Sequence, residues 1–122
     1  SMELPIQLAL TYPERLPCAL PTPDFAKLGA LRFETVDEAR YPCFTVAKEC
    51  AREGGSLPCV LNAAGEIAVR AFLGGQIKYT KIAQILEGTH SRFAREEVSD
   101  YAQLLETDER ARAIANQLIA EG

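Results

Sequence analysis

Asn62, Glu66 and Arg70 are the side chains whose types and spacing most suggest chemistry. They lie four residues apart, so on an α-helix they form one row along a single face. Such a row would present an amide, a carboxylate and a guanidinium to a ligand. The simpler interpretation is an exposed or interface-facing row, with Glu66 and Arg70 in an ion pair worth about 0.3–0.5 kcal/mol. We favour it because no second carboxylate and no metal-ligand spacing accompanies the row.

Two other groups have the side chains of a catalytic or metal site. His90 is the single histidine, and it would be a candidate general base or ligand. No partner carboxylate is identifiable by spacing, so we interpret it as a half-buried histidine at the edge of the core. Acidic residues cluster at Glu96-Glu97 with Asp100, and at Asp108-Glu109. They do not match an EF-hand loop, and helix starts explain most of them. A small metal-dependent enzyme would rest on these clusters alone.

The cysteines, at positions 18, 43, 50 and 59, are predicted to be free, mostly buried thiols of a reducing compartment. None belongs to a CxxC pair. If Cys43 and Cys50 share a helix, they are separated by about 10.5 Å of rise, too far for a disulfide. With one histidine in the chain, a Cys/His zinc site would have few ligands.

The composition indicates an ordinary globular domain and excludes several classes of function. The 122 residues carry 13 basic and 17 acidic side chains, for a net charge of −4. This argues against nucleic acid as a partner, because neutralising phosphates needs a basic patch. No apolar run approaches the ~20 residues of a membrane span. We expect no signal peptide, because Glu3 and Pro5 interrupt the start. Neither GxGxxG nor GxxxxGK[ST] is present.

Residues 1–40 are predicted to form an extended, proline-rich arm. A short helix within residues 4–17 is stopped by Pro13. Four of the seven prolines lie within residues 13–23. Residues 30–34 alternate weakly, as a short strand would; because the chain offers nothing to pair with, the alternative is a segment that lies flat on the helical body. An irregular segment of this kind has too few apolar contacts to order itself. We therefore expect the arm to be mobile, or captured by a neighbouring copy, when its partner domain is absent.

Residues 41–122 are predicted to fold as an antiparallel bundle of four to five helices, which makes the chain mainly α. The predicted helices span about 42–53, 58–73, 81–94, 98–105 and 108–121. Prolines at the start and glycine pairs after the end delimit the first two helices, and Thr80 and Thr107 are predicted N-caps of the third and last. Gly65 costs about 1 kcal/mol relative to alanine inside a helix, so it indicates a close neighbouring backbone or a bend.

Five short motifs, spread in order along the chain, resemble one enzyme family. They are Pro5-Ile6 with Ala9, Tyr12-Pro13 with Arg15, Tyr41-Pro42-Cys43, Leu61-Asn62-Ala63-Ala64 with Glu66, and Ala71-Phe72-Leu73. Over essentially its whole length, the sequence resembles the C-terminal third of 1-deoxy-D-xylulose 5-phosphate reductoisomerase. One position departs from the family, because Gly65 stands where the pattern Asn-Ala-Ala-Asn-Glu usually has its second asparagine. This departure bears on the local contacts of that helix.

The resemblance implies a parent enzyme that rearranges and reduces 1-deoxy-D-xylulose 5-phosphate to 2-C-methyl-D-erythritol 4-phosphate, in non-mevalonate isoprenoid biosynthesis. It implies NADPH and a divalent metal, Mg or Mn, as cofactors. It also implies a homodimer of three-domain chains. Residues 1–40 correspond to a remnant of the central-domain helix plus a linker, and residues 41–122 to the C-terminal helical bundle. We expect the parent in the bacterial cytoplasm, with a plastid as the alternative.

The family's glycine-rich NADPH motif, metal-binding carboxylates and phosphate-binding residues have no counterpart in this sequence. The piece alone is therefore expected to be inactive, with no catalytic residue or metal ligand and no bound cofactor. Met2 is the position expected to align near the nicotinamide pocket of the parent. Asn62, Glu66 and Arg70 are expected to be structural, interdomain residues that face the missing NADPH-binding and catalytic domains. The alternative is a stand-alone helical interaction module derived from that domain.

Overall fold

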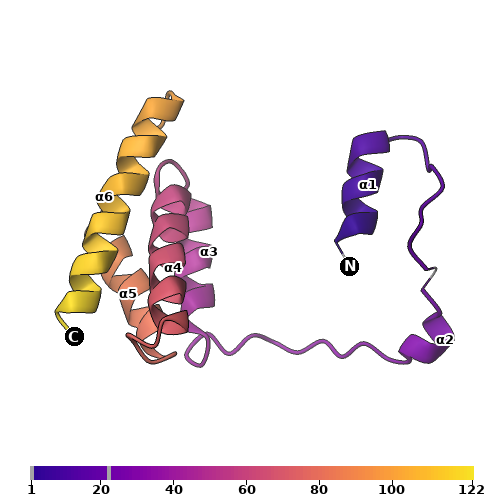
Figure 1. The fold of residues 1–122 in the computed structure, drawn as a ribbon, viewed down its shortest axis with the longest axis horizontal. Coiled ribbons are helices and arrows are strands. Elements are labelled where there is room, and N and C mark those ends of the chain that lie inside the picture. The colour runs from indigo at the N-terminus through magenta and orange to yellow at the C-terminus, as the bar shows by residue number, and fades with distance from the viewer. Residues whose placement is uncertain (1, 22) are drawn as a thin grey trace. The chain divides into compact units, whose positions relative to one another are not determined.

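A computed structural model describes residues 2–21 and 23–122, and within these ranges the chain contains helices and no strands. The helices are Glu3–Thr11 (α1), Phe25–Leu28 (α2), Pro42–Glu53 (α3), Leu57–Leu73 (α4), Lys81–His90 (α5) and Tyr101–Ala120 (α6) (Figure 1). The chain divides into two compact units, Ser1–Thr35 and Val36–Gly122. The mainly α architecture predicted from the sequence is confirmed.

The first unit is organised by hydrogen bonds from two polar side chains of α1. Gln7 Nε2 donates to the carbonyl oxygens of Leu16 and Pro17, at 3.5 and 3.1 Å. Thr11 Oγ1 lies 3.0 Å from the carbonyl oxygen of Gln7 and 2.9 Å from that of Glu14. These bonds fold the chain after the helix back along it. None of the described side chains of α1 is buried, so the helix has no core of its own.

A short helix in the arm was not predicted, and the short strand, one of the two alternatives for residues 30–34, is not formed. The Asp24 side chain accepts from the backbone N–H groups of Ala26 and Lys27, at 3.1 and 3.3 Å, and this N-cap starts α2. Gly29, with φ +68°, ends it. Residues 30–34 have no regular structure. A single strand is unstable without a partner, and the described residues supply none.

The starts and ends predicted for α3 and α4 are confirmed. Pro42 occupies N1 of α3, and Pro58 lies in the first turn of α4. Gly54 and Gly55 follow α3 with φ of +71° and +58°, a backbone conformation that glycine adopts without strain. A Cβ at Gly55 would lie only 2.4 Å from the Glu96 carbonyl oxygen. This turn therefore requires glycine for its conformation and for its packing.

The two predicted threonine caps fared differently. Thr80 occupies the N-cap position of α5, as predicted, but it makes no side-chain cap bond, and α5 ends at His90 rather than near Ala94. Thr107 was wrongly predicted as a cap. Residues 101–120 form one helix, capped by Asp100, whose Oδ1 accepts from the Gln103 N–H at 2.9 Å. Thr107 lies inside this helix, where its hydroxyl donates to the Gln103 carbonyl at 2.8 Å. A threonine hydroxyl can satisfy itself in this way at any helix position, so Thr107 does not mark a start.

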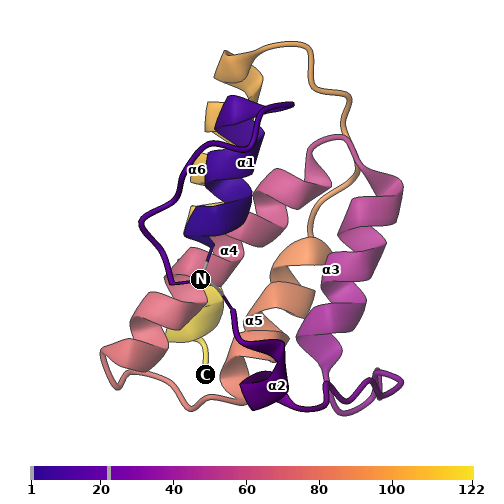
Figure 2. The same cartoon turned by 90° about the vertical axis from the view of Figure 1, so that its right-hand side faces the viewer.

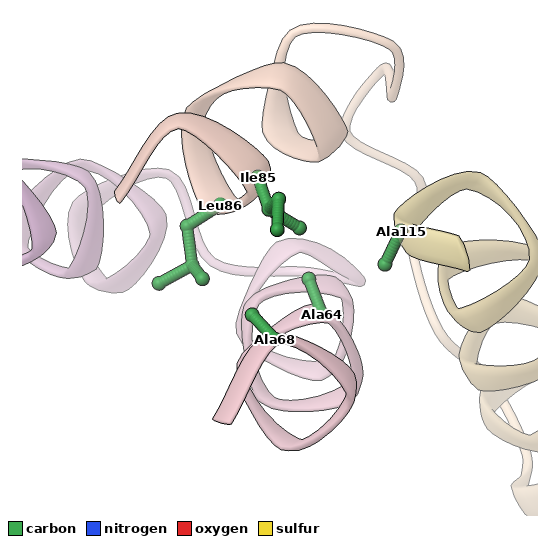
Figure 3. Close-up of a cluster of buried hydrophobic side chains, with 5 residues drawn as sticks. All are labelled: Ala64, Ala68, Ile85, Leu86 and Ala115. Carbon is green, nitrogen blue, oxygen red and sulfur yellow. The ribbon is translucent and has the colours of Figure 1, made fainter. Parts of the chain in front are cut away.

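In the second unit, each helix runs roughly opposite to the helix that precedes it in the chain (Figure 2), which confirms the predicted antiparallel bundle. Helix α4 is central and packs against α3, α5 and α6. Its buried face consists largely of alanines, which let neighbouring helices approach closely. Figure 3 shows one core cluster, formed by Ala64, Ala68, Ile85, Leu86 and Ala115. Two smaller clusters lie around Val46, Cys50 and Leu57, and around Val60, Ala63 and Ala111.

The segment between α5 and α6 is fastened to the turn before α4. The backbone N–H of Ser56 donates to the Glu96 carbonyl at 3.0 Å, and the Ser56 hydroxyl accepts from the Glu96 N–H at 3.1 Å. Ser56 is buried. Arg95 Nε donates to the Glu53 carbonyl at 2.7 Å. These three bonds hold an irregular segment against the end of α3, so Ser56 has a structural role that spacing alone did not reveal.

The four cysteines are free thiols, but they are not all buried. Cys50 is buried in the core, Cys43 and Cys59 are half-buried, and Cys18 is exposed, so the thiols as a group are less buried than predicted. Burial raises the pKa of the Cys50 thiol, and the carboxylate of Glu53 adds to the shift. The helices that the structure describes are all too short or too polar to cross a membrane.

Candidate functional site

The predicted row of Asn62, Glu66 and Arg70 lies on the outer face of α4, opposite the core. All three side chains are exposed. They border an open groove along the helix, lined by Leu61, Asn62, Gly65, Glu66, Val69, Arg70 and Leu73. Helix α4 places them there because its small apolar residues recur on the inner face at helical spacing, which turns the residues between them outward. The row is therefore a polar edge beside an apolar strip formed by Leu61, Val69 and Leu73.

The ion pair predicted within the row is replaced by a longer-range one. Glu66 Oε2 accepts from Arg112 Nη2 on α6 at 2.9 Å, and Arg112 is the ion-pair partner found for Glu66 among the described residues. Asp108 holds the same guanidinium through Nε, at 2.5 Å, and through Nη2, at 3.1 Å. Hydrogen bonds to Asp108 and then to Glu66 raise the pKa of Arg112 above its ordinary value. The row is thus tied to a second helix.

Arg112 is the residue of this face that the sequence analysis missed. Asp108 and Arg112 lie four residues apart on α6, a spacing that forms an ion pair on a helix surface. That signal was available, but the expected helix start near Thr107 made the acidic residue look like part of a first turn. The meeting of Arg112 with Glu66 depends on the packing of α4 against α6, which a single sequence does not reveal.

Gly65 faces open space at the centre of the groove. A Cβ built on it would have no heavy atom within 4 Å. Helix α4 continues through it from Leu57 to Leu73. The neighbouring backbone that the sequence analysis considered is therefore not found in the described part of this chain. Two apolar residues of the strip are also uncovered, with Val69 exposed to 45% and Leu73 to 77%, whereas Leu61 is half-buried and packs against the core.

Met2 belongs to the first unit and His90 to α5, so neither is a residue of the row on α4. Met2 precedes α1 and is exposed to 71%, and its carbonyl accepts from the Ile6 N–H at 3.2 Å. Its predicted relation to a nicotinamide pocket stays a prediction. His90 is the last residue of α5 and is half-buried, as its simpler interpretation required. Its carbonyl accepts from the Phe93 N–H at 3.0 Å.

The acidic clusters are used in ion pairs and a helix cap. Glu96 pairs with Arg110 at 3.5 Å, Glu97 pairs with Arg95, and Asp100 caps α6. In residues 2–21 and 23–122, no three His, Cys, Asp or Glu side chains converge as a metal site would require. The face on α4 offers hydrogen bonds, charge and apolar contact, which suits binding to another protein surface.

Three comparisons with known proteins bear on this chain. The sequence profile of the DXP reductoisomerase C-terminal domain matches residues 1–114. The 1-deoxy-D-xylulose 5-phosphate reductoisomerase of Nitrosomonas eutropha is 41% identical over 116 residues, which are 95% of this chain and 28% of that protein. The enzyme of the same name from Thermodesulfovibrio yellowstonii is 42% identical over 120 residues, 98% of this chain and 32% of that protein.

Solved structures give the same result. The 1-deoxy-D-xylulose 5-phosphate reductoisomerase of Zymomonas mobilis, in complex with NADPH, superposes with a TM-score of 0.86 at 37% identity, over 98% of this chain and 32% of that one. A DOX-P reductoisomerase with fosmidomycin and magnesium gives a TM-score of 0.82 at 34% identity, with the same coverage. The chain thus spans about a third of the length of the proteins it matches.

Proposed function

This chain belongs to the family of DXP reductoisomerase C-terminal domains, and from that premise we propose that it is the C-terminal part of a 1-deoxy-D-xylulose 5-phosphate reductoisomerase. The observation that carries the proposal is the family match over residues 1–114, which covers the first unit and most of the second. The complete protein would convert 1-deoxy-D-xylulose 5-phosphate to 2-C-methyl-D-erythritol 4-phosphate with NADPH and Mg or Mn. It would act as a homodimer in the bacterial cytoplasm, without nucleic acid as a partner.

Within that protein, the role of this chain would be structural. The bundle would support the catalytic part, and the face of Asn62, Glu66 and Arg70 would dock against it. The uncovered apolar strip beside the row supports this role, because contiguous apolar surface rimmed by polar residues marks interaction sites. Met2, in the arm, would lie near the nicotinamide. NADPH, metal and substrate would be held by residues of the part that this chain lacks.

Two measurements test the proposal. We expect the chain alone to bind no NADPH in a fluorescence titration with or without Mg²⁺, because no glycine-rich phosphate loop is present in its sequence. The complete protein encoded by the same reading frame should oxidise NADPH when 1-deoxy-D-xylulose 5-phosphate and Mg²⁺ are added. Saturable NADPH binding by the chain alone would contradict its structural role. A complete protein without this activity would contradict the enzyme assignment.

The second candidate is a stand-alone helical interaction module. It is favoured by the second unit, whose core is formed entirely by its own helices. An antibody raised against the bundle distinguishes the two on a blot of native lysate. A band several-fold larger than 13.4 kDa is expected for the reductoisomerase. A band at the mass of the chain would mean that the cell makes the bundle alone.

A further inference from the structure

Arg112 lies where α6 meets the proposed docking face of α4, the face of Asn62, Glu66 and Arg70. Its guanidinium is fixed by contacts within this chain. Asp108 accepts two hydrogen bonds from it, one through each carboxylate oxygen. Such a two-point contact fixes the plane of a guanidinium as well as its position. The remaining contact is to Glu66 on α4, through Nη2 at 2.9 Å. Arg112 is therefore fixed by Asp108 on its own helix, α6, and it contacts the exposed Glu66 on α4.

The consequence for Glu66 is a carboxylate with one oxygen held and one available. Oε2 accepts from Arg112, whereas Oε1 accepts no hydrogen bond from the described residues. The side chain is half exposed, at 50%. An unrestrained glutamate at that exposure would sample many rotamers, and a partner would have to order it on binding. The contact with Arg112 orders it in advance.

We propose that Arg112 is a positioning residue of the docking face, which aims Glu66 Oε1 at an N–H donor in the catalytic part of the reductoisomerase. This inference rests on the proposed function. The occupant is the part of the enzyme outside this chain, which amounts to about two thirds of the length of the relatives. Asp108, Glu66 and Arg112 together carry a net charge of −1, which favours such a donor. Gly65 leaves room beside Glu66 for its close approach.

The competing explanation is that Arg112 only fastens α6 to α4. The two explanations differ in what the substitution changes. If Arg112 only fastens the helices, its substitution would lower the stability of the bundle and leave docking intact in any molecule that still folds. A positioning role would alter docking in the folded enzyme, and it would do so through Glu66. The test therefore measures stability in this chain and docking in the complete protein.

The variants are R112Q, E66Q and the double variant R112Q/E66Q, with R92Q as the matched control. Arg92 also forms a surface ion pair, with Glu121 at 3.6 Å, but it lies off the docking face. Thermal melts of the 122-residue chain confirm that each variant folds. In the complete protein, hydrogen exchange of peptides covering residues 61–73 measures docking, and NADPH oxidation measures kcat/KM. R112K keeps the charge but loses the two-point contact, so it should restore kcat/KM and exchange protection only partly relative to R112Q.

We expect R112Q and E66Q to lower kcat/KM by a similar factor, about tenfold, as for other coupled contacting residues. The double variant should be no worse than the worse single variant, and R92Q should be unchanged. Exchange at 61–73 should become faster in R112Q and E66Q in the complete protein. An R112Q enzyme that folds, keeps its activity and keeps its protection overturns the inference, as do strictly additive losses. Absence of activity in the unsubstituted enzyme would overturn the proposed function alone, and the exchange measurement would still decide the role of Arg112.

Discussion

At the scale of single residues, two buried threonines of the bundle behave in opposite ways. Thr107 is buried, and its hydroxyl is satisfied by the Gln103 carbonyl. Thr89 is also buried, and its hydroxyl has no hydrogen-bond partner in the described structure. A buried hydroxyl without a partner costs roughly 1–3 kcal/mol, because it loses its bonds to water. The threonine hydroxyl thus stabilises the structure at Thr107 and destabilises it at Thr89.

This difference predicts opposite effects for one substitution. Thr89→Val should raise the free energy of unfolding by about 1 kcal/mol, because valine has nearly the same shape and no hydroxyl to satisfy. Thr107→Val should lower it by a similar amount, about 1 kcal/mol, because it removes a formed hydrogen bond. Urea unfolding of the chain measures both. A destabilised Thr89→Val variant would mean that a bound water satisfies the hydroxyl.

At the scale of elements, the sequence was most informative where proline restricts the backbone and glycine allows a positive φ. The bounds of α3 and α4 could be predicted because Pro42 and Pro58 fix φ and lack an N–H, and because Gly54, Gly55 and Gly75 adopt positive φ, whatever packs around them. The ends of α5 and α6 could not be predicted in this way. Thr80 stands at a helix start without a side-chain cap bond, and Thr107 bonds inside a helix, so a threonine alone does not mark where a helix begins.

In the candidate site too, features within one helix were predictable and a contact between two helices was not. That Asn62, Glu66 and Arg70 share a face follows from helical spacing, so it was predictable. The pairing of Glu66 with Arg112 joins positions 46 residues apart, and it depends on how α4 and α6 pack. A single sequence contains no periodicity that connects two helices at that separation.

Two glycines, one inside α4 and one in the turn before it, give a prediction at this scale. Gly65 lies inside α4 with open space where a Cβ would be, so Gly65→Ala should stabilise the chain by roughly 0.5–1 kcal/mol. Gly55→Ala is the contrasting variant. It should destabilise by about 2 kcal/mol or more, because its φ is +58° and a Cβ would collide with the Glu96 carbonyl. Denaturant midpoints of the two variants compare them, and a destabilised Gly65→Ala would show that α4 is bent there.

At the scale of the whole molecule, the two units differ in how much apolar surface they bury. The second unit has a core drawn from all four of its helices. The first unit has no buried residue in either of its helices. Its large side chains are open instead, with Leu10 exposed to 82%, Phe25 to 79% and Phe33 to 89%. Surface of this kind is expected where a partner normally covers it.

We therefore expect the chain to self-associate when it is studied alone. Sedimentation velocity over a dilution series should show concentration-dependent oligomers, because the apolar residues of the first unit will cover one another. Removal of residues 1–35 should give a monomer with an unchanged thermal midpoint, since the second unit keeps its core. A full chain that stays monomeric throughout the series would contradict the expectation.

The alanines of α4 have a consequence for how this domain can change over evolutionary time. Ala63, Ala64 and Ala68 are completely buried against neighbouring helices, so any larger side chain there would push those helices apart. Across the same helix, the proposed docking face would have to keep its fit to a second surface. A helix constrained on both sides has few positions that can drift independently. We expect α4 to be the slowest-changing helix of the domain, and compensating changes to appear in α5 and α6 instead.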